Sequence, residues 1–546
     1  MEPGTKVHVE PVSPPGEDHS KTVRDTLSTN VVIDMSARIG YLLTRFFIPP
    51  FVLAHVGLDA YGLWSTAFIL VSYLGVSTLG ISNVYIKFVA EYSARKDYQR
   101  ANALLSTGLM VTTPLCSALF VLLYFGWPRL VEYLNVPAPL QTDAQEVVLL
   151  VVAIFLSSIA FSGFRDALTG VQKLAVVQTS WMIAYLVETA LIFILIGAGR
   201  GIRGLAEAFL IRILLEILLA AFFAFRRLPW LKISISLFDR PSLHLLFSFG
   251  GVVQLLSLVS IILNSIERAL AAPLVGLESA GLLDIGKKLP NMASSVPHAF
   301  AASLVPAASY LQGGLDGKPE EQEKARKLYV KGARYMNLAT AFVCGLLATA
   351  PLPLLDVWLG KRYPGTAFLM VVFCLSTQAH LMTGPGTSIL KGLGRPKEEM
   401  HYIIPNLVAV VIFLAVSYLL VGWTTFGIAV SVSAAKIVSV VYFIRRSNRL
   451  LGVSDGSYLR SVALPGIAPY LIGLVLSLPV HLAQAHVSRW TLALFLLALG
   501  LAYSLAVLLV VDRWVFESGE RLWFHAVIQD RVGRWRPSLR LNAKEG

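Results

Sequence analysis

Charged residues are scarce in this 546-residue sequence: 14% are Asp, Glu, Lys or Arg, whereas 55% are hydrophobic. Soluble domains carry about a quarter charged residues, so the composition excludes an ordinary soluble domain. Apolar runs such as 147–160, 338–350 and 492–511 are typical of helices that cross a bilayer, which need about 20 mostly apolar residues. These runs lack the alternation of apolar and polar residues that is typical of β-barrel strands. We therefore expect an all-α polytopic membrane protein.

Cysteine is rarer still, with Cys116, Cys344 and Cys374 far apart in apolar segments. Their number and spacing favour neither a disulfide framework nor a metal site. No Walker A or HExxH sequence occurs, and the G-x-G-x-x-G match at 199–204 follows no predicted strand. We expect no cofactor, no metal and no enzymatic activity.

The apolar segments predict about fourteen transmembrane helices, which places both termini on one side of the membrane. Their expected bounds are 30–54, 61–86, 102–125, 146–164, 174–197, 204–225, 244–269, 280–308, 335–354, 365–390, 401–421, 424–444, 463–483 and 490–511.

Basic residues are distributed unequally between the two sides. The tails and the loops on their side hold 33 Lys and Arg, whereas the opposite loops hold 6. This bias places both termini in the cytoplasm. It also accounts for the net charge of +13 without a nucleic-acid partner, since no basic patch is interleaved with aromatic residues.

The chain is expected to divide at its polar segments. The first 24 residues lack the apolar core of a signal peptide and are predicted to form a disordered cytoplasmic tail. The predicted parts are an N-lobe of spans 1–6 (25–226), a basic cytoplasmic linker (227–243), a C-lobe of spans 7–12 (244–446), spans 13 and 14 (447–511), and a basic amphipathic tail (512–546) that favours lipid surfaces.

One phrase occurs twice. Residues 55–64 read HVGLDAYGLW and residues 274–283 read LVGLESAGLL, at an offset of 219. Residues 166–170 have a counterpart at 388–392, and 204–206 at 427–429. Each match falls six spans after its partner, so the copies share one orientation. This indicates a parallel repeat of two six-helix lobes, an arrangement typical of alternating access. The glycines of the phrase are expected to allow a tight turn into the next helix.

The phrase at 56–64, the stretch NVYIKFVAE at 83–91 and VGLESAGLLDIGKKL at 275–289 resemble the MOP exporter superfamily. The resemblance covers spans 1–12 and is to the polysaccharide-exporter branch, that is, Wzx-like O-antigen or teichoic acid flippases. It implies a flippase for lipid-linked oligosaccharide in the bacterial cytoplasmic (inner) membrane, with polysaccharide polymerases or glycosyltransferases as neighbours in the pathway.

Ionisable residues inside a bilayer are costly, so each is a functional candidate. In span 1, Asp34, Arg38 and Arg45 fall on one helical face. Asp34 and Arg38 could equally form a stabilising i,i+4 pair, whereas Arg45 has no evident local partner. In span 8, Asp284, Lys288 and Asn291 share a face, with Lys287 at its edge.

Further charges lie in spans 5, 6, 7 and 12. Glu188 is isolated in sequence and is a candidate for ion coupling or a silent hydrogen-bonded acid. Arg212 and Glu216 are expected to form a neutralised pair, with Lys436 at nearly the equivalent place in the second copy. Glu267 and Arg268 in span 7 are further candidates, Arg268 for substrate binding.

The faces in spans 1 and 8 each carry two cations and one acid, which suits an anion such as phosphate. We therefore expect transport of a polyprenyl-diphosphate oligosaccharide, with Arg38, Arg45, Arg268, Lys287, Lys288 and Asn291 binding substrate, and Asp34, Glu188 and Asp284 coupling to an ion. Membrane lipids are the other expected partners. One alternative is a MATE-like cation or multidrug antiporter, which predicts an acidic cavity. A membrane glycosyltransferase would need a larger extramembrane part than the longest connection, 309–334.

Overall fold

The computed structural model describes residues 40, 44–74, 81–294, 297, 300, 301, 304, 308, 319–363, 365–516 and 521. The chain divides into two compact units. Unit 1 comprises residues 1–56, 70–131 and 138–258, and unit 2 comprises residues 57–69, 132–137 and 259–546. None of the described residues forms a β-strand, in agreement with the all-α prediction.

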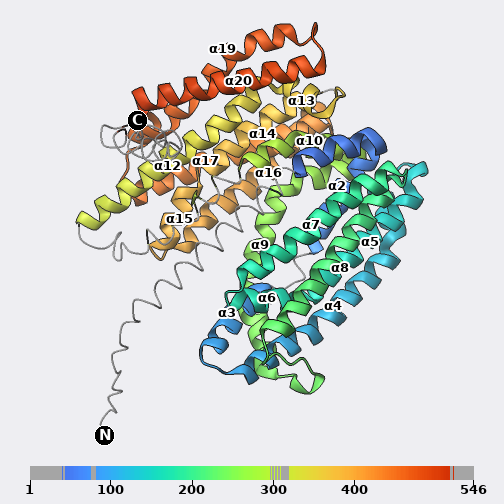
Figure 1. The fold of residues 1–546 in the computed structure, drawn as a ribbon. Coiled ribbons are helices and arrows are strands. Elements are labelled where there is room, and N and C mark those ends of the chain that lie inside the picture. Colours follow the sequence, from blue (N-terminus) through green and yellow to red (C-terminus); the bar gives the residue numbers. More distant parts are fainter. Residues whose placement is uncertain are drawn as a thin grey trace, which may run out of the picture. The chain divides into compact units, whose positions relative to one another are not determined.

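Unit 1 is a bundle of long apolar helices that pack lengthwise (Figure 1). In this unit α7 runs along α8, and α5 also packs on α8. Its helices are 44–56, α3 (Ile81–Ala94), α4 (Tyr98–Tyr133), η2 (Ala138–Leu140), α5 (Gln141–Ala160), α6 (Ser162–Gly170), α7 (Leu174–Gly197), α8 (Gly201–Arg227), η3 (Ile235–Leu237) and the first part of α9 (Arg240–Leu274).

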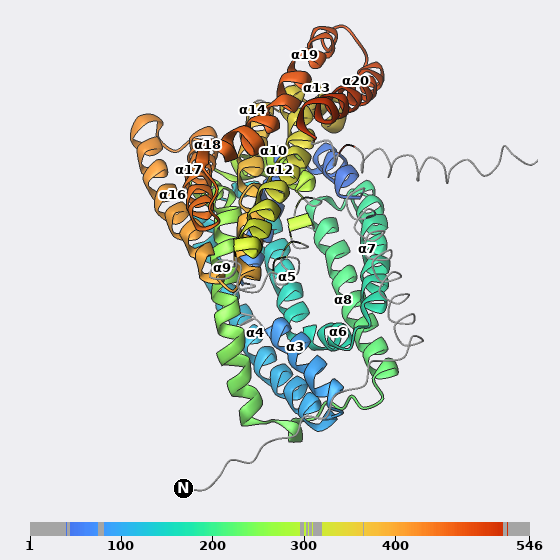
Figure 2. The ribbon, with the colours of Figure 1, turned by 90° about the vertical axis from the view of Figure 1, so that its left-hand side faces the viewer.

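Unit 2 contains the first part of α2 (Leu58–Leu74) and the remainder of α9. In it α12 packs on α14 and α19, and α16 on α17 (Figure 2). Its other elements are α10 (Leu277–Ala293), α12 (Pro319–Thr349), α13 (Pro351–Leu359), α14 (Thr366–Leu381), α15 (Gly384–Gly392), η4 (Pro396–Glu399), α16 (Met400–Val421), α17 (Thr425–Leu450), α18 (Asp455–Tyr458), η5 (Leu459–Ala463), η6 (Leu464–Ile467), α19 (Ala468–Ala483), α20 (Arg489–Val510) and η7 (Val511–Val515).

Within the described residues, nine helical segments are long and apolar enough to cross a membrane, or ten when α12 and α13, bent by 78°, count as one span. These match predicted spans 3–6 and 9–14. The predicted spans 1, 2, 7 and 8 include residues or side chains outside the description, so the total of fourteen stays a prediction. The expected connection at 309–334 was too long, because α12 already begins at Pro319.

The backbone repeats as the sequence predicts. The nine-residue helices α6 and α15 correspond residue for residue at an offset of 222. Gly57 and Gly276, equivalent positions of the repeated phrase, have φ of +81° and +130° before α2 and α10. These φ values suit glycine, because a Cβ atom is disfavoured there. The glycines therefore form the expected turns.

The two copies of the phrase also contact one another within unit 2. A Cβ atom at Gly62 would overlap the carbonyl group of Leu277, and one at Gly281 would lie 3.1 Å from the carbonyl oxygen of Leu58. Leu58 and Leu277 are equivalent residues, as are the two glycines, so the contact is reciprocal. Only residues without side chains allow α2 and α10 to approach this closely.

The connector between the copies is fixed along α4 in unit 1. Asn102 donates to the carbonyl oxygen of Trp230 at 2.8 Å and accepts from the amide of Lys232 at 3.0 Å. Ser106 accepts from the amide of Ser234, and Thr107 from that of Asp239. These bonds satisfy backbone groups of an irregular segment. The connector therefore belongs to unit 1 up to the start of α9.

Candidate functional site

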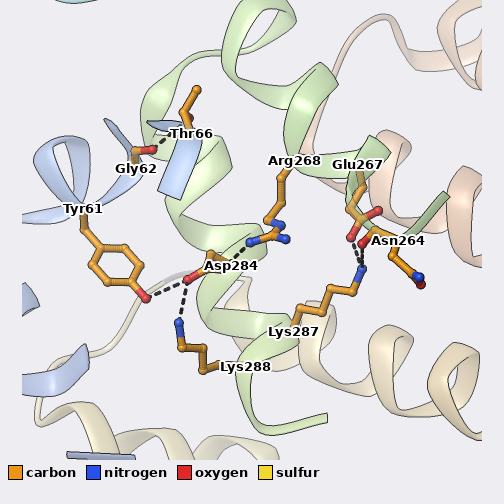
Figure 3. A network of polar contacts seen from close by, with 9 residues as sticks. All are labelled: Tyr61, Gly62, Thr66, Asn264, Glu267, Arg268, Asp284, Lys287 and Lys288. Atoms are coloured by element: carbon orange, nitrogen blue, oxygen red, sulfur yellow. Dashed lines mark hydrogen bonds and ion pairs between the residues drawn. The ribbon is translucent and has the colours of Figure 1, made fainter. Parts of the chain in front are cut away.

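A buried carboxylate organises the charged residues of α9 and α10 in unit 2 (Figure 3). Arg268 donates to Asp284 Oδ1 at 2.7 Å, and Lys288 donates to Oδ2 at 3.3 Å. Tyr61 of α2 also donates to Oδ2, at 2.7 Å. The Asp284 side chain is 12% exposed, whereas Arg268 and Lys288 are 21% and 26% exposed. Both cations thus keep an accessible edge while Asp284 holds them in place.

A second ion pair, Lys287–Glu267, is more deeply buried. Lys287 lies about one helical turn after Asp284 in α10. Lys287 binds Glu267 and also donates to the carbonyl oxygen of Asn264 at 2.6 Å. Its ammonium lies 5.7 Å from the centre of the Phe373 ring. Lys287 and Glu267 are 8% and 1% exposed. In this conformation Lys287 is therefore occupied by protein partners.

Lys436 of α17 adds a further positive charge beside this pair. The residue is 7% exposed, and its charge interacts with those of Lys287 and Glu267. We find no hydrogen bond or ion pair of its ammonium within the described part of the chain. Lys436, Lys287, Lys288 and Arg268 therefore face two carboxylates. With ordinary protonation this group, which we call the unit 2 cluster, has a net charge of +2.

The buried charges of unit 1 are arranged differently, as an alternating series from α6 to α7. The successive contacts are Asp166–Arg165 at 3.2 Å, Arg165–Glu216 at 3.7 Å, Glu216–Arg212 at 3.2 Å and Arg212–Glu188 at 3.2 Å. From Arg165 to Glu188 the exposed fraction falls from 43% to 4%, whereas Asp166, at the other end of the series, is 2% exposed. Arg45 adds its charge near Glu188, and its guanidinium lies 5.4 Å from the centre of the Tyr185 ring. These six charges sum to zero, and we call them the unit 1 series.

These contacts revise one expectation and add to a second. Glu188 is not isolated, because the fold places α8, with Arg212, beside α7. Arg45 does have acidic and aromatic neighbours, Glu188 and Tyr185, although neither is local in sequence. The predicted Arg212–Glu216 pair is confirmed.

Residues 28–312 match the sequence pattern of a protein family described as "Polysaccharide biosynthesis protein". This match covers more than half of the chain. The chain belongs to the polysaccharide biosynthesis protein family. It is also 22% identical over 350 residues to the "Uncharacterized membrane protein EpsK" of Bacillus subtilis (strain 168), covering 62% of this chain and 67% of that protein.

Solved structures share the fold of this polysaccharide biosynthesis protein. An inward-facing multidrug resistance MATE family transporter of the MOP superfamily matches with a TM-score of 0.64 and 14% identity, over 78% of this chain and 99% of the other. The lipid II flippase MurJ in an inward closed conformation matches with a TM-score of 0.61 and 12% identity, over 93% and 100%. The family match and the apolar helices identify a multi-pass membrane protein of the polysaccharide biosynthesis protein family, with a fold that these two transporters share.

The other predicted site residues are more dispersed. Asp34 and Arg38 lie outside the described residues. Asn291 is exposed near the end of α10, about one turn beyond Lys288. The structure thus brings together Arg268, Asp284, Lys287 and Lys288, and it places Arg45 and Glu188 in the unit 1 series.

Sequence patterns missed Tyr61 and Glu267 as partners of the charged helix. Tyr61 is 223 residues from Asp284 along the chain, so the sequence alone does not indicate that the two side chains are close in space. One indication was nevertheless present in the sequence. Tyr61 belongs to the repeated phrase, but the equivalent residue of the second copy is Ala280, so the two copies differ at this position. Within the described chain, no group of three or more His, Cys, Asp or Glu side chains is arranged to hold a metal ion.

Proposed function

We propose that this protein is a flippase for a polyprenyl-diphosphate-linked oligosaccharide and works by alternating access. The observation that carries the proposal is the unit 2 cluster, where partly accessible Arg268 and Lys288 surround one carboxylate. Arginine and lysine are the usual partners of phosphate. The family and the fold of transporters support the same function.

In this proposal, a substrate phosphate takes the place of Asp284 as the counter-ion of Arg268 and Lys288. Without substrate, Asp284 neutralises much of the charge of Arg268 and Lys288 and keeps their side chains ordered. A substrate phosphate competes with Asp284 for the same donors, so binding alters contacts between α9, α10 and α2. Such differential contacts are what allows a ligand to shift a conformational equilibrium. Asp284 is therefore our first candidate for coupling, and Asn291 extends the polar face of α10.

The remaining predicted roles stay proposals. Arg45 and Arg38 are proposed to bind substrate from span 1, and Asp34 and Glu188 to take part in ion coupling. We place the protein in the bacterial cytoplasmic membrane with both termini in the cytoplasm, because the basic loops are on that side. The repeated phrase then lies at the outer ends of α2 and α10.

The test is transport in proteoliposomes with a fluorescent polyprenyl-diphosphate glycan. We expect wild-type protein to move the lipid between leaflets. The variant with Arg268→Gln and Lys288→Gln should be slower by about a hundredfold, because it loses two charge-assisted contacts. Lys361→Gln, an exposed lysine outside the cluster, is the matched control and should transport normally.

Two results would contradict this function. Failure of wild-type protein to move the glycolipid would reject it outright. Export of small cationic dyes without glycolipid movement would favour the MATE-like alternative, to which the fold alone is equally similar. The net positive charge of the unit 2 cluster argues against that alternative, since a cation carrier needs an acid-dominated cavity.

A further inference from the structure

The charge of the unit 2 cluster separates into two parts. Arg268 and Lys288 share Asp284, which leaves one excess positive charge. Lys287 and Lys436 have one carboxylate in reach, Glu267, and Lys287 already binds it. The second excess charge therefore belongs to Lys436. A lone ammonium that is more than nine-tenths buried is costly to keep in a protein interior.

Among the residues that the structure describes, no carboxylate other than Glu267 offsets this charge. α17 packs against α16, α14 and α10. The titratable side chains beside it on α14 and α16 include His380 and Tyr402, which hydrogen-bond to each other at 2.8 Å. Neither contributes a negative charge in its ordinary state. On α10 the nearest charge is Lys287 itself, which repels Lys436.

The first copy of the repeat has a different arrangement at nearly the same place. Arg212 of α8 contacts two carboxylates, Glu188 and Glu216. At the offset of 223, Glu216 corresponds to Ser439 in α17 and Arg212 to Ala435, the residue directly before Lys436. The second copy thus keeps a buried cation but has a neutral residue where the first has a carboxylate. An anion from outside the protein is the natural complement of that missing charge.

We propose that Lys436 is a specificity-determining residue that lets the unit 2 cluster prefer diphosphate-linked over monophosphate-linked lipids. The inference rests on the proposed function. A sugar-bearing lipid diphosphate carries about two negative charges near neutral pH, whereas the corresponding monophosphate diester carries one. Arg268, Lys288 and Asp284 alone match the monophosphate, and Lys436 supplies the second unit of charge.

The experiment compares two lipids that carry the same sugar and the same polyprenyl tail. One has a diphosphate link and the other a monophosphate link. Binding and flipping of each are measured for wild type, Lys436→Met and Lys436→Arg in vesicles of phosphatidylethanolamine and phosphatidylglycerol. Lys391→Met is the control, because Lys391 is 42% exposed and pairs with Glu399 outside the cluster.

We expect wild type to bind the diphosphate lipid more tightly. Lys436→Met should weaken diphosphate binding by about tenfold, the effect of one charge-assisted contact, and change monophosphate binding by less than about twofold. Lys436→Arg should restore the preference, and Lys391→Met should keep it. A merely structural role of Lys436 would not change the ratio of the two affinities.

Four results overturn the inference. Equal weakening of both lipids by Lys436→Met, or no change in either, rejects the role of Lys436 and leaves the flippase proposal standing. Equal affinity of wild type for both lipids does the same. If wild-type protein neither binds nor moves either lipid, the proposed function fails and the inference fails with it.

Discussion

Arg212 in unit 1 and Lys436 in unit 2 occupy nearly equivalent positions of the two copies, but their surroundings differ. Arg212 lies between two carboxylates and belongs to a series without net charge. Lys436 shares a single carboxylate with Lys287 in a cluster of net charge +2. The copies therefore agree in backbone and differ in charge. A neutral series is what stability favours, whereas an uncompensated charge indicates a ligand.

The largest expected effect is a difference between Arg212→Met and Lys436→Met. Arg212→Met leaves Glu188 and Glu216 buried without the cation between them and should lower the free energy of unfolding by about 3–5 kcal/mol. Lys436→Met leaves the Lys287–Glu267 pair intact and removes an excess buried charge, so it should not destabilise the protein. Steric trapping in bicelles measures both values. Similar losses in the two variants would contradict the assignment of neutral and charged units.

Asp284→Asn should have an intermediate effect. The substitution keeps the shape of the side chain but removes the charged acceptor of Tyr61, Arg268 and Lys288. We expect a loss of about 2–3 kcal/mol in the free energy of unfolding, less than for Arg212→Met, because water can reach Arg268 and Lys288. Asp143→Asn, which alters a half-exposed pair with Arg203, is the control and should cost less than about 1 kcal/mol. A loss as large as that of Arg212→Met would show that the cluster is sealed from water.

The contact between α2 and α10 at Gly62 and Gly281 tests a feature that the two copies share. Gly62→Ala places a methyl group in overlap with the carbonyl oxygen of Leu277 and should cost about 1–3 kcal/mol, whereas Gly281→Ala meets Leu58 at 3.0–3.1 Å and should cost less. Gly126→Ala, inside α4 with open space around it, should instead stabilise by up to about 1 kcal/mol. The same unfolding measurement applies. A harmless Gly62→Ala, at the tighter of the two positions, would refute the close contact of α2 and α10.

The smallest effect is expected for Arg165→Gln at the exposed end of the unit 1 series. Arg165 is 43% exposed, so water can replace its contact with Glu216, and the amide introduced by the substitution can still donate a hydrogen bond to Asp166, which is itself 2% exposed. We expect a loss below about 1 kcal/mol, and the thermal midpoint of the purified protein should hardly change. A loss comparable to that of Arg212→Met would mean that the series acts as one unit and not as graded pairs.

Much of the fold follows from local patterns. Apolar runs of bilayer length predict the long helices, and short matches at offsets of 219 to 223 predict the paired elements α6 and α15. Those signals lie within single helices or turns, so they need no knowledge of packing. The early start of α12 at Pro319 was missed because its first turns are charged and resemble a solvated loop.

The candidate site was only partly predictable. Asp284 and Lys288 are four residues apart, and helical geometry alone places them on one face. Tyr61, Glu267 and the neighbours of Arg45 join through contacts between distant segments, which depend on how whole helices cross. The same limit explains why Glu188 looked isolated, since its partner Arg212 comes from the adjacent helix.

Residues 57–69 of the first copy belong to unit 2, where Gly62 packs against Leu277 and Tyr61 reaches Asp284. Neither half of the gene therefore encodes one complete unit, because residues 57–69, which belong to unit 2, are encoded in the first half. An ancestor with a single copy would have needed a second molecule to cover the same glycine face.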